Sequence, residues 1–382
     1  MKVALVCTEN LPSPAIKGGA IQVLIDGIVP ILSEKHDISI FSVADHSLPN
    51  REIVNNIEYI RVPYKNYMRE IAKLLSQSRF DIIQVYNRPK AILHFKEVAP
   101  NSKLILSLHN DVLREEKVAY ELGKKVIETC DHIFAISQYI KQELMNRFPE
   151  AGDKTTVVYS GVNLNDYSPI WSSHIQPIRQ HYREKYGVEN KKVILFAGRL
   201  CKSKGPHILI QAMRSLIKKH PDAVLVIAGG KWFSDNTINH YVYYLYQLAK
   251  PLKEKVIFTK FIPAQEIPKF FLIADIFVCS SQWEEPLARV HYEAMAAGLP
   301  IITTNRGGNT EVITHLKNGY VIDDYNVPKQ FADAIDYYLC NPNVALQFAK
   351  NGRLLVEENF QYKHTVKRLE TAYEAIKEGI TN

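Results

Sequence analysis

Two basic residues follow a strand-like run near the middle of the chain, at a spacing that could hold an anion. Arg199 comes just after the apolar run Val193–Ala197, and Lys204 stands shortly before Pro206 opens the next helical segment. Proline suits the first turn of a helix, and the N-terminus of a helix favours negative charge. Arg199 and Lys204 could therefore bind a diphosphate beside that terminus. The same spacing also fits a solvated basic loop.

Two of the carboxylates in the segment 280–313, SSQWEEPLARVHYEAMAAGLPIITTNRGGNTEVI, are candidates for binding hydroxyl groups. Glu285 follows an apolar run that ends at Cys279, and Glu293 completes the pattern E-x7-E inside an alanine-rich helical stretch. A carboxylate can accept paired hydrogen bonds from neighbouring hydroxyl groups, as a sugar or a ribose presents them. Glu293 could equally be a surface charge, so the pattern alone leaves its role open.

A glycine pair follows the first strand-like run of the chain. Gly18 and Gly19 precede a helical stretch that begins at Ala20. Glycines at this place let backbone N–H groups approach an anion at the helix N-terminus, although a flexible turn would look the same. The chain contains no G-x-G-x-x-G, which argues against a dinucleotide-dependent dehydrogenase.

Short apolar runs alternate with longer amphipathic segments along most of the chain. Such alternation predicts parallel sheets covered by helices on both faces, and ligands bind beyond the carboxyl ends of their strands. Residues 168–178, SPIWSSHIQPI, interrupt the pattern and indicate a linker. We therefore expect an α/β fold of two Rossmann-like domains at 1–168 and 169–360. A C-terminal helix at 361–382 could pack back on the N-terminal domain.

The composition is that of an ordinary globular protein, with 382 residues of which 46% are hydrophobic and 23% charged. The net charge of +7 is mild and scattered, which suits a small anionic ligand or a membrane surface and predicts no nucleic-acid partner. The five cysteines form no metal or redox spacing, and the first apolar run is too short for a signal peptide. No apolar run approaches the roughly 18–20 residues of a membrane span. We expect a cytoplasmic protein without a transmembrane segment.

Jointly, these motifs resemble those of family 4 of the retaining glycosyltransferases, which have the GT-B fold. The likeness rests on E-x7-E followed by A-x-A-A-G-L-P-I-I, on GRL…KG upstream and on the N-terminal Gly-Gly, and it covers essentially the whole chain. The segments SSQWEEPLARVHYEAMAAGLP, KGPHILIQA and GGKWFSDN resemble, more narrowly, a bacterial spore coat protein. The resemblance implies two domains facing each other across a cleft, the first binding the acceptor and the second a nucleotide sugar.

The resemblance also implies roles for single residues. Arg199 and Lys204 resemble the pair that holds the diphosphate. Glu285 resembles the carboxylate that holds hydroxyls of the donor sugar, and Glu293 the one that holds the ribose. His109, just after a strand-like run, resembles the active-site histidine near the sugar, although backbone groups alone could satisfy it. We expect catalysis to depend on the histidine, the two basic residues and Glu285.

Further donor contacts follow from the same resemblance. Gly19 resembles the glycine whose amide faces the transferred sugar and the leaving phosphate. Leu287 and Ala288 lie in the loop expected to surround the donor sugar. Phe261 and Ile262 lie in the loop expected to bind the base, after Lys260, where the family commonly has a glycine.

The donor loop departs from the usual family sequence. Glu285-Pro286-Leu287-Ala288 stands where Glu-Gly-Phe-Gly is usual, and Gly307–Glu311 reads Gly-Gly-Asn-Thr-Glu instead of Gly-Gly-x-Pro-Glu. The proline and the alanine reduce backbone freedom, and the proline also removes an N–H donor. We therefore expect a restricted choice of donor sugar.

The resemblance implies a retaining transfer from a nucleotide sugar, expected to be UDP-linked, to a glycan, lipid or protein acceptor. The leaving diphosphate itself would help to deprotonate the acceptor. The chain has no Asp-x-Asp, so we expect no metal and no cofactor beyond the co-substrate. Two alternatives remain. One is a spore coat component with weak or no catalysis, which would reside in the coat with other coat proteins. The other is a nucleotide-sugar epimerase, which would need no acceptor.

Overall fold

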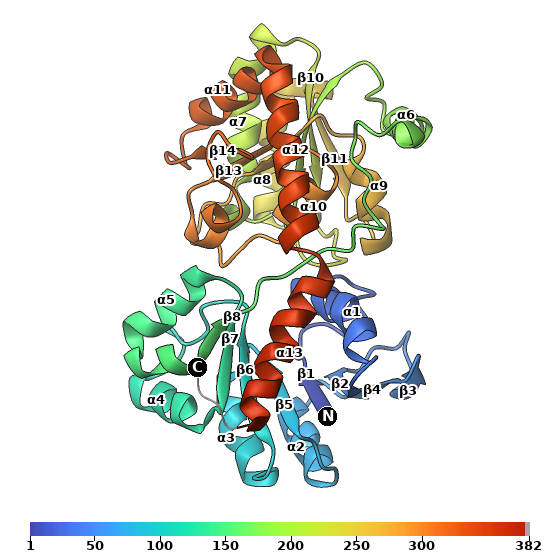
Figure 1. Cartoon of the computed structure of the whole chain (residues 1–382). Coiled ribbons are helices and arrows are strands. Elements are labelled where there is room, and N and C mark those ends of the chain that lie inside the picture. The colour runs from blue at the N-terminus through green and yellow to red at the C-terminus, as the bar shows by residue number, and fades with distance from the viewer. Residues whose placement is uncertain (379–382) are drawn as a thin grey trace. The chain divides into compact units, whose positions relative to one another are not determined.

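The computed structural model describes residues 1–378 and divides into two α/β units (Figure 1). The first unit contains Met1–Gly161 together with the chain from Tyr362 onward, and the second contains Val162–Gln361. Each unit has one sheet with helices on its faces, as the alternation of apolar runs predicts, so the expected α/β class is confirmed.

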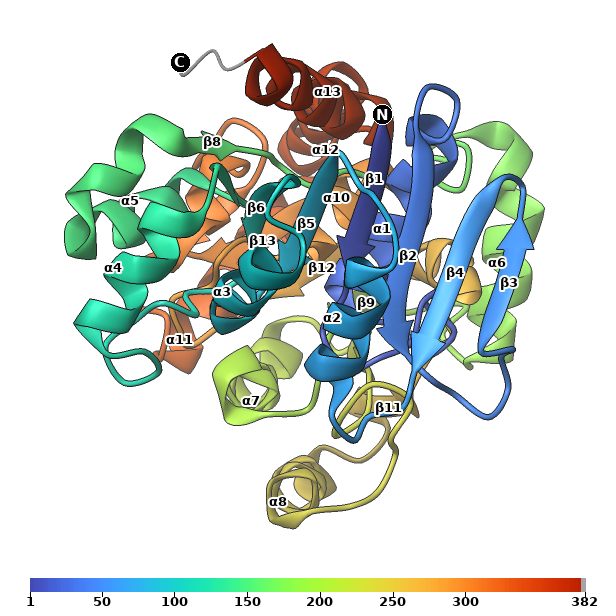
Figure 2. The ribbon, with the colours of Figure 1, turned by 90° about the horizontal axis from the view of Figure 1, so that it is seen from below.

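The first unit has an eight-stranded sheet. Its strands are β1 Lys2–Val6, β2 Asp37–Val43, β3 Arg51–Val54, β4 Ile57–Val62, β5 Ile82–Tyr86, β6 Lys103–Leu108, β7 His132–Ala135 and β8 Thr155–Val157. They lie in the order β3-β4-β2-β1-β5-β6-β7-β8, as Figure 2 shows for the part from β3 to β6. The edge pair β3 and β4 is antiparallel, and the other neighbours are parallel.

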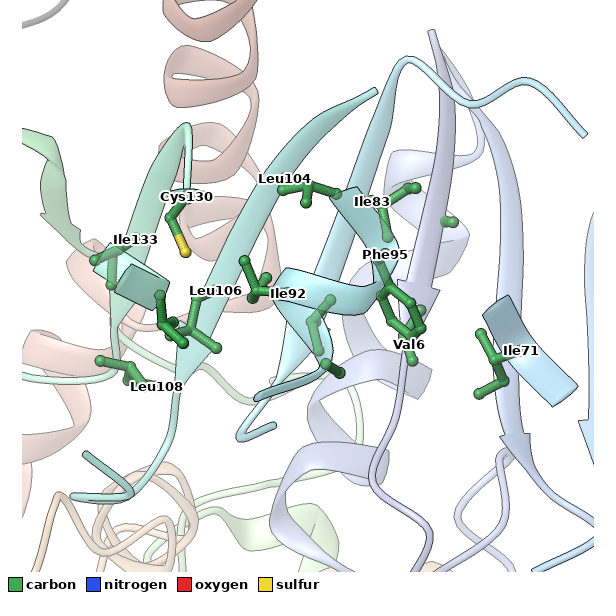
Figure 3. Packing of buried hydrophobic residues seen from close by; sticks show 14 of the residues in the cluster. Val6, Ile71, Ile83, Ile92, Phe95, Leu104, Leu106, Leu108, Cys130 and Ile133 are labelled. Carbon is green, nitrogen blue, oxygen red and sulfur yellow. The ribbon is translucent and has the colours of Figure 1, made fainter. Parts of the chain in front are cut away.

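Helices cover both faces of this sheet. They are α1 Ala20–Leu32, α2 Tyr67–Ser76, α3 Pro89–Val98, α4 Tyr120–Thr129, α5 Gln138–Arg147 and α13 Tyr362–Glu378. Side chains alternate between the two faces along β1, with Val3 and Leu5 in one core cluster and Ala4 and Val6 in the other. Figure 3 shows the second cluster, to which Phe95 of α3 also belongs. This double burial explains why the strands read as continuous apolar runs.

Helix α13 belongs to the first unit although it ends the chain. Its residues Val366, Leu369 and Tyr373 are buried in the same core cluster as α1. Gly27 of α1 allows this packing, since a Cβ there would lie 2.1 Å from the ring of Tyr362. Residues 379–382 of the expected C-terminal helix lie outside the described residues.

The second unit has a six-stranded sheet, and all its neighbours are parallel. Its strands are β9 Lys192–Ala197, β10 Ala223–Ala228, β11 Val256–Lys260, β12 Ile276–Cys279, β13 Ile301–Thr304 and β14 Tyr320–Ile322, in the order β11-β10-β9-β12-β13-β14. Its helices are α6 Gln176–Lys185, α7 Pro206–Lys219, α8 His240–Ala249, α9 Ile267–Phe271, α10 Val290–Ala296, α11 Pro328–Cys340 and α12 Pro342–Asn359. Proline opens α7, α11 and α12, where its missing N–H costs no helical hydrogen bond.

In each sheet the chain first adds strands on one side of its first strand and then on the other side. In the second unit the chain proceeds outward from β9 through β10 to β11, and then starts again on the other side of β9 with β12. The loops that follow β9 and β12 therefore leave the sheet next to each other, at a switch point where open parallel sheets bind ligands. The loops after β1 and β5 stand in the same relation in the first unit.

The boundary between the units lies at residues 161 and 162, whereas the composition of the linker suggested residue 168. Val162 already belongs to the second unit, because its N–H donates to the carbonyl oxygen of Phe360. The linker residue Ile170 donates in the same way to Ala297. Among the described residues, no helix is long and apolar enough to cross a membrane.

Candidate functional site

The loops after β9 and β12 are joined directly. Gly205, the residue before α7, has φ +71°, and a Cβ there would lie 2.1 Å from the carbonyl oxygen of Ser280. The Ser280 hydroxyl donates to the carbonyl oxygen of Lys204 at 3.0 Å, and the amide of Gln282 donates to the carbonyl oxygen of Ser203 at 2.7 Å. Glycine is therefore needed for this close approach, which brings Lys204 to the end of β12.

Lys204 and Glu285 form the centre of the site. The Lys204 Nζ lies 2.6 Å from Glu285 Oε2, and the same oxygen accepts from Ser281 Oγ at 2.7 Å and Trp283 Nε1 at 2.8 Å. Among the described residues, no hydrogen bond reaches Glu285 Oε1. Burial opposes ionisation of this carboxyl, but the charge of Lys204 and the three hydrogen bonds outweigh it, so its pKa is lowered. Glu285 is therefore an ionised carboxylate with one oxygen left to accept.

The glycine-rich turn after β13 supports the backbone of Glu285. The amide of Gly308 donates to the Glu285 carbonyl oxygen at 2.8 Å. Gly307 has φ +56°, and a Cβ there would lie 2.1 Å from the same oxygen. Glu284, between Trp283 and Glu285, turns instead to the Gly307 amide at 2.7 Å and to Arg306 Nη1 at 2.7 Å. The glycine pair is thus required by its contact with the carboxylate-bearing loop.

The rest of the donor loop is buried. Leu287 and Ala288 are both largely inaccessible, and the Ala288 amide donates to Asn309 Oδ1 at 3.4 Å. A Cβ on Gly308 would lie 2.2 Å from the carbonyl oxygen of Pro286. The loop that departs from the usual family sequence is therefore packed firmly against the glycine-rich turn.

Arg199 is held by the loop that follows β10. Its guanidinium carbon lies 4.6 Å from the ring centroid of Trp232 and 5.8 Å from that of Phe233, which are cation–π distances. Gly229 allows the two loops to meet, because its φ is +142° and a Cβ would lie 1.9 Å from the Gly198 carbonyl oxygen. Arg199 and Lys204 thus leave the same loop, each with its own supporting partners.

Glu293 is not a surface charge. Its side chain, in α10, is only 12% exposed, and Oε1 accepts from Arg289 Nη2 at 2.8 Å. Burial raises the pKa of this carboxyl, and the arginine only partly offsets that effect. Glu293 is therefore a largely buried carboxylate that is paired with Arg289.

The loop after β11 is tied to the loop after β10. The amide of Phe261 donates to Asn236 Oδ1 at 2.9 Å, and the Gly229 amide donates to the carbonyl oxygen of Lys260. Lys260 has φ +65°, which explains why glycine is common at this place in the family. Ile262 is buried and Phe261 is partly exposed, so of these two apolar side chains Phe261 is the more accessible.

His109 and Gly19 belong to the first unit. His109 follows β6, its amide donates to Asn87 Oδ1 at 2.8 Å, and its ring lines a narrow cavity beside Tyr86. Burial lowers the pKa of His109 to about 4, so its imidazole is neutral at neutral pH. Gly19 has φ +104°, a conformation in which any other residue would be strained, and a Cβ would lie 2.5 Å from Gln22 Oε1.

Metal-ligating side chains come together elsewhere in the described part of the chain. His220, Asp336 and Cys340 lie at the end of α7 opposite to Lys204. His220 Nε2 is 2.7 Å from Asp336 Oδ1, and Lys219 pairs with the other oxygen of that carboxylate. This group therefore has no part in the site around Glu285.

Three supporting side chains did not emerge from the sequence, namely Ser281, Trp283 and Trp232. Each comes shortly after a strand, and the two tryptophans stand in segments that carry the family resemblance. That position was the only feature of the sequence that could have pointed to the two tryptophans as site residues. Their contacts with Glu285 and Arg199 depend on loop conformation, which the spacing does not reveal.

The paired parallel sheets define the structural class, which is GT-B. The crystal structure of Anabaena Alr3699/HepE in complex with UDP superimposes with a TM-score of 0.80 and 21% sequence identity, covering 98% of this chain and 100% of that one. A likeness at this identity establishes the fold.

The family follows from sequence comparison. A model of glycosyl transferases group 1 matches residues 178–355, and a model of Glycosyltransferase Family 4 matches residues 29–166. The YtcC protein of Bacillus subtilis is 54% identical over 98% of this chain and 92% of its own length. Spore coat protein SA of the same organism is 44% identical over 98% of this chain and 99% of its own. The chain belongs to the group 1, family 4 glycosyltransferases, which confirms the resemblance and makes it an enzyme.

Proposed function

We propose that this glycosyltransferase transfers a sugar from a UDP-linked donor to a hydroxyl group of a glycan, lipid or protein, with retention of configuration and without a metal ion. The observation that carries the proposal is the convergence of Lys204 and Glu285 at the switch point of the second sheet. It places a cation at the start of a helix beside an ionised carboxylate, so that one site offers groups for a diphosphate and for sugar hydroxyls.

The diphosphate would bind at the start of α7. Lys204 stands at the helix N-terminus, where the helix dipole also favours an anion. Arg199 supplies a second cation from the same loop, held by the faces of Trp232 and Phe233. Two cations and the dipole would stabilise the charge that develops on the departing diphosphate, with no divalent ion.

The rest of the donor would bind along the loops already joined to this point. Glu285 Oε1 would accept a hydrogen bond from a sugar hydroxyl, and Glu293 would accept from the ribose. Phe261 and Ile262 would contact the base. Uridine is the base to test first, because the HepE structure named above is a UDP complex.

The reaction itself would occur at the anomeric carbon of the sugar. The bond from this carbon to the diphosphate oxygen breaks, a bond to the acceptor oxygen forms on the same face, and the acceptor proton passes to the departing diphosphate. Neutral His109 would exchange hydrogen bonds with the sugar, and the Gly19 amide would face the phosphate. The acceptor would bind to the first unit, which carries these two residues.

A thermal-shift screen with nucleoside diphosphates and nucleotide sugars tests the donor, since a ligand that binds the folded state raises its stability by RT ln(1 + [L]/Kd). We expect UDP to stabilise the protein more than GDP or ADP. NMR of the sugar product then gives its anomeric configuration. An inverted product would refute retention, and conversion of the donor sugar without any acceptor would favour the epimerase alternative.

A location in the spore coat is a second proposal, supported by the identity with Spore coat protein SA. Fractionation of spores with an antibody to the chain tests it. Recovery only from the soluble fraction of vegetative cells would reject the coat and favour the cytoplasm.

A further inference from the structure

The hydrogen bonds of Glu285 are unevenly distributed between its two oxygens. Lys204, Ser281 and Trp283 all donate to Oε2, and among the described residues none donates to Oε1. We propose that Trp283 is a positioning residue that keeps Glu285 oriented and ionised when a bound diphosphate draws Lys204 away. This inference rests on the proposed function, because it assumes that one site binds both diphosphate and sugar.

The indole of Trp283 contacts both members of the central ion pair. Its Nε1 lies 2.8 Å from Glu285 Oε2, and the Lys204 Nζ lies 5.7 Å from the ring centroid. An indole N–H can only donate a hydrogen bond, so it cannot turn around to accept one from a sugar hydroxyl. Trp283 therefore fixes which oxygen of Glu285 is committed to the protein and which remains for the ligand.

Local chain geometry explains how a residue so near in sequence reaches the carboxylate. Trp283 and Glu285 are two positions apart and meet through their side chains, while Glu284 between them turns to Arg306. In this loop the side chains of Trp283 and Glu285 turn toward each other and that of Glu284 turns away. The contact thus requires the loop conformation that the Gly307–Gly308 turn supports.

The ammonium group of Lys204 cannot bind the Glu285 carboxylate and a diphosphate equally strongly at the same time. Its ammonium group donates to Glu285 Oε2 at 2.6 Å. A diphosphate carries more negative charge than a carboxylate and would attract this ammonium group. A buried carboxylate that loses its cation tends to take up a proton, and a protonated Glu285 would then donate where the sugar needs an acceptor. The hydrogen bonds from Trp283 and Ser281 oppose that protonation.

Within residues 1–378, the other titratable groups that interact with Glu285 supply no positive charge. Besides Lys204 these are His291 and Cys279. Burial lowers the pKa of His291 to about 4, so it is neutral at neutral pH. Burial also raises the pKa of Cys279, so its thiol stays protonated. Once Lys204 has moved, the two neutral donors are what holds the carboxylate ionised.

The test uses the full chain, in which all tryptophans are labelled with ¹⁵N and all glutamates with ¹³C at Cδ. The three tryptophans give three indole N–H signals, and Trp283→Phe identifies the signal of Trp283. In wild type we expect this signal to shift with pH together with the Glu285 carboxyl carbon, and to be insensitive to that titration in Glu285→Gln. On addition of UDP, it should move further downfield as the indole takes a larger share of the carboxylate.

The variant must also show the predicted consequence. Trp283→Phe keeps an aromatic ring for Lys204 while it removes the N–H and part of the indole ring, so UDP affinity should stay within about twofold. Glu285 should then protonate at a higher pH in the UDP complex than it does in wild type. The best-binding UDP-sugar binds more tightly than UDP by a factor that the sugar contributes. We expect this factor to fall roughly tenfold in Trp283→Phe, about the effect of losing one hydrogen bond to a charged group. Trp171→Phe, a tryptophan outside the site, is the matched control and should change none of these values.

The proposal would be overturned if the chemical shift of the Trp283 indole N–H changed with neither pH nor UDP. It would also be overturned if Glu285 protonated at the same pH in Trp283→Phe as in wild type. Both readouts are made without any sugar. If UDP and all nucleotide sugars fail to bind, the proposed function fails, and with it the proposal that Trp283 acts in a donor site. If UDP binds and Glu285 titrates alike in wild type and Trp283→Phe, only the positioning role fails.

Discussion

The guanidinium of Arg199 lies against the indole of Trp232, with 4.6 Å between the guanidinium carbon and the ring centroid. The two residues follow neighbouring strands, β9 and β10, and meet because Gly229 allows its loop to approach the carbonyl oxygen of Gly198 closely. A flexible arginine is thereby held in one place before any ligand arrives. If Arg199 binds the diphosphate, part of its effect should depend on this aromatic support.

We predict that Arg199→Ala weakens UDP binding by about 1.5–3 kcal/mol, the range for a lost hydrogen bond to a charged group. Trp232→Ala should weaken it by about 0.5–1 kcal/mol, since the charge remains but its cation–π support is lost. Isothermal titration calorimetry measures both. Tyr243→Ala, which removes another exposed aromatic side chain from the second unit, should leave the affinity unchanged. Unchanged UDP affinity in Arg199→Ala would remove this residue from the diphosphate site.

The ion pair of Lys204 with Glu285 leads to a prediction of opposite sign. A diphosphate must compete with the carboxylate for the ammonium group, and the carboxylate also repels it. Glu285→Gln removes that charge while keeping the side-chain shape, so we expect UDP to bind roughly threefold more tightly. Lys204→Ala should weaken UDP binding by about 1.5–3 kcal/mol. Glu254→Gln makes the same chemical change at an exposed position of this unit and serves as the control.

The same Glu285→Gln variant should lose the contribution of the sugar. An amide oxygen accepts more weakly than a carboxylate, and the amide can also present its NH₂ group to the ligand. Calorimetry with UDP and with the best-binding UDP-sugar separates the two effects. Weaker UDP binding in Glu285→Gln would show that the carboxylate does not compete with the diphosphate.

The sequence was informative where a structural feature repeats locally. Each buried strand is a short apolar run, and proline or glycine marks helix starts such as Pro206, so the α/β class followed directly. The edge strand Arg51–Val54 was not predicted, because it has no apolar run. It is antiparallel to its neighbour and largely exposed, and the side chain of Ile53 is 72% accessible. Edge strands are specified by pairing more than by burial.

The sequence identified the individual site residues, but it did not predict which side chains they contact. The sequence pointed to Arg199 and Lys204 as a pair, whereas in the structure Lys204 bonds to Glu285 and Arg199 stacks on Trp232. That division depends on β9 lying between β10 and β12, an order that is fixed by tertiary packing. Trp283 could not be assigned because its role depends on which way each side chain of an irregular loop turns.

Metal independence is a further prediction, motivated by the missing Asp-x-Asp and by the two cations near the start of α7. UDP affinity, sugar transfer and any donor hydrolysis should all survive an excess of EDTA, because Arg199 and Lys204 carry the compensating charge. Activity that disappears with EDTA and returns with Mn²⁺ or Mg²⁺ would refute this. Asp336→Asn, which breaks the separate group at His220 and Cys340, controls for an effect of chelation elsewhere.

The last prediction concerns the donor loop, in which Pro286 and Ala288 replace the glycines usual in the family. Both residues are buried, and the loop is held by the Ala288 amide on Asn309 and by the tight contact of Pro286 with Gly308. Proline fixes φ and offers no N–H, and the alanine methyl group occupies space that a glycine would leave open. We therefore expect UDP to bind well and UDP-glucose or UDP-N-acetylglucosamine to add little affinity beyond it.

The double substitution Pro286→Gly with Ala288→Gly should widen the range of accepted sugars while UDP affinity stays within about twofold, because the contacts of Lys204 and Arg199 are untouched. Two glycines also increase the freedom of the unfolded chain, so we expect a loss of stability of about 1–2 kcal/mol. Melting temperatures with and without UDP show whether the variant is folded before its sugar range is compared. Pro342→Gly with Ala345→Gly, in α12, makes the same exchange outside the site and should leave sugar selectivity as it is. Efficient turnover of UDP-glucose or UDP-N-acetylglucosamine by wild type would mean that this loop does not restrict the donor.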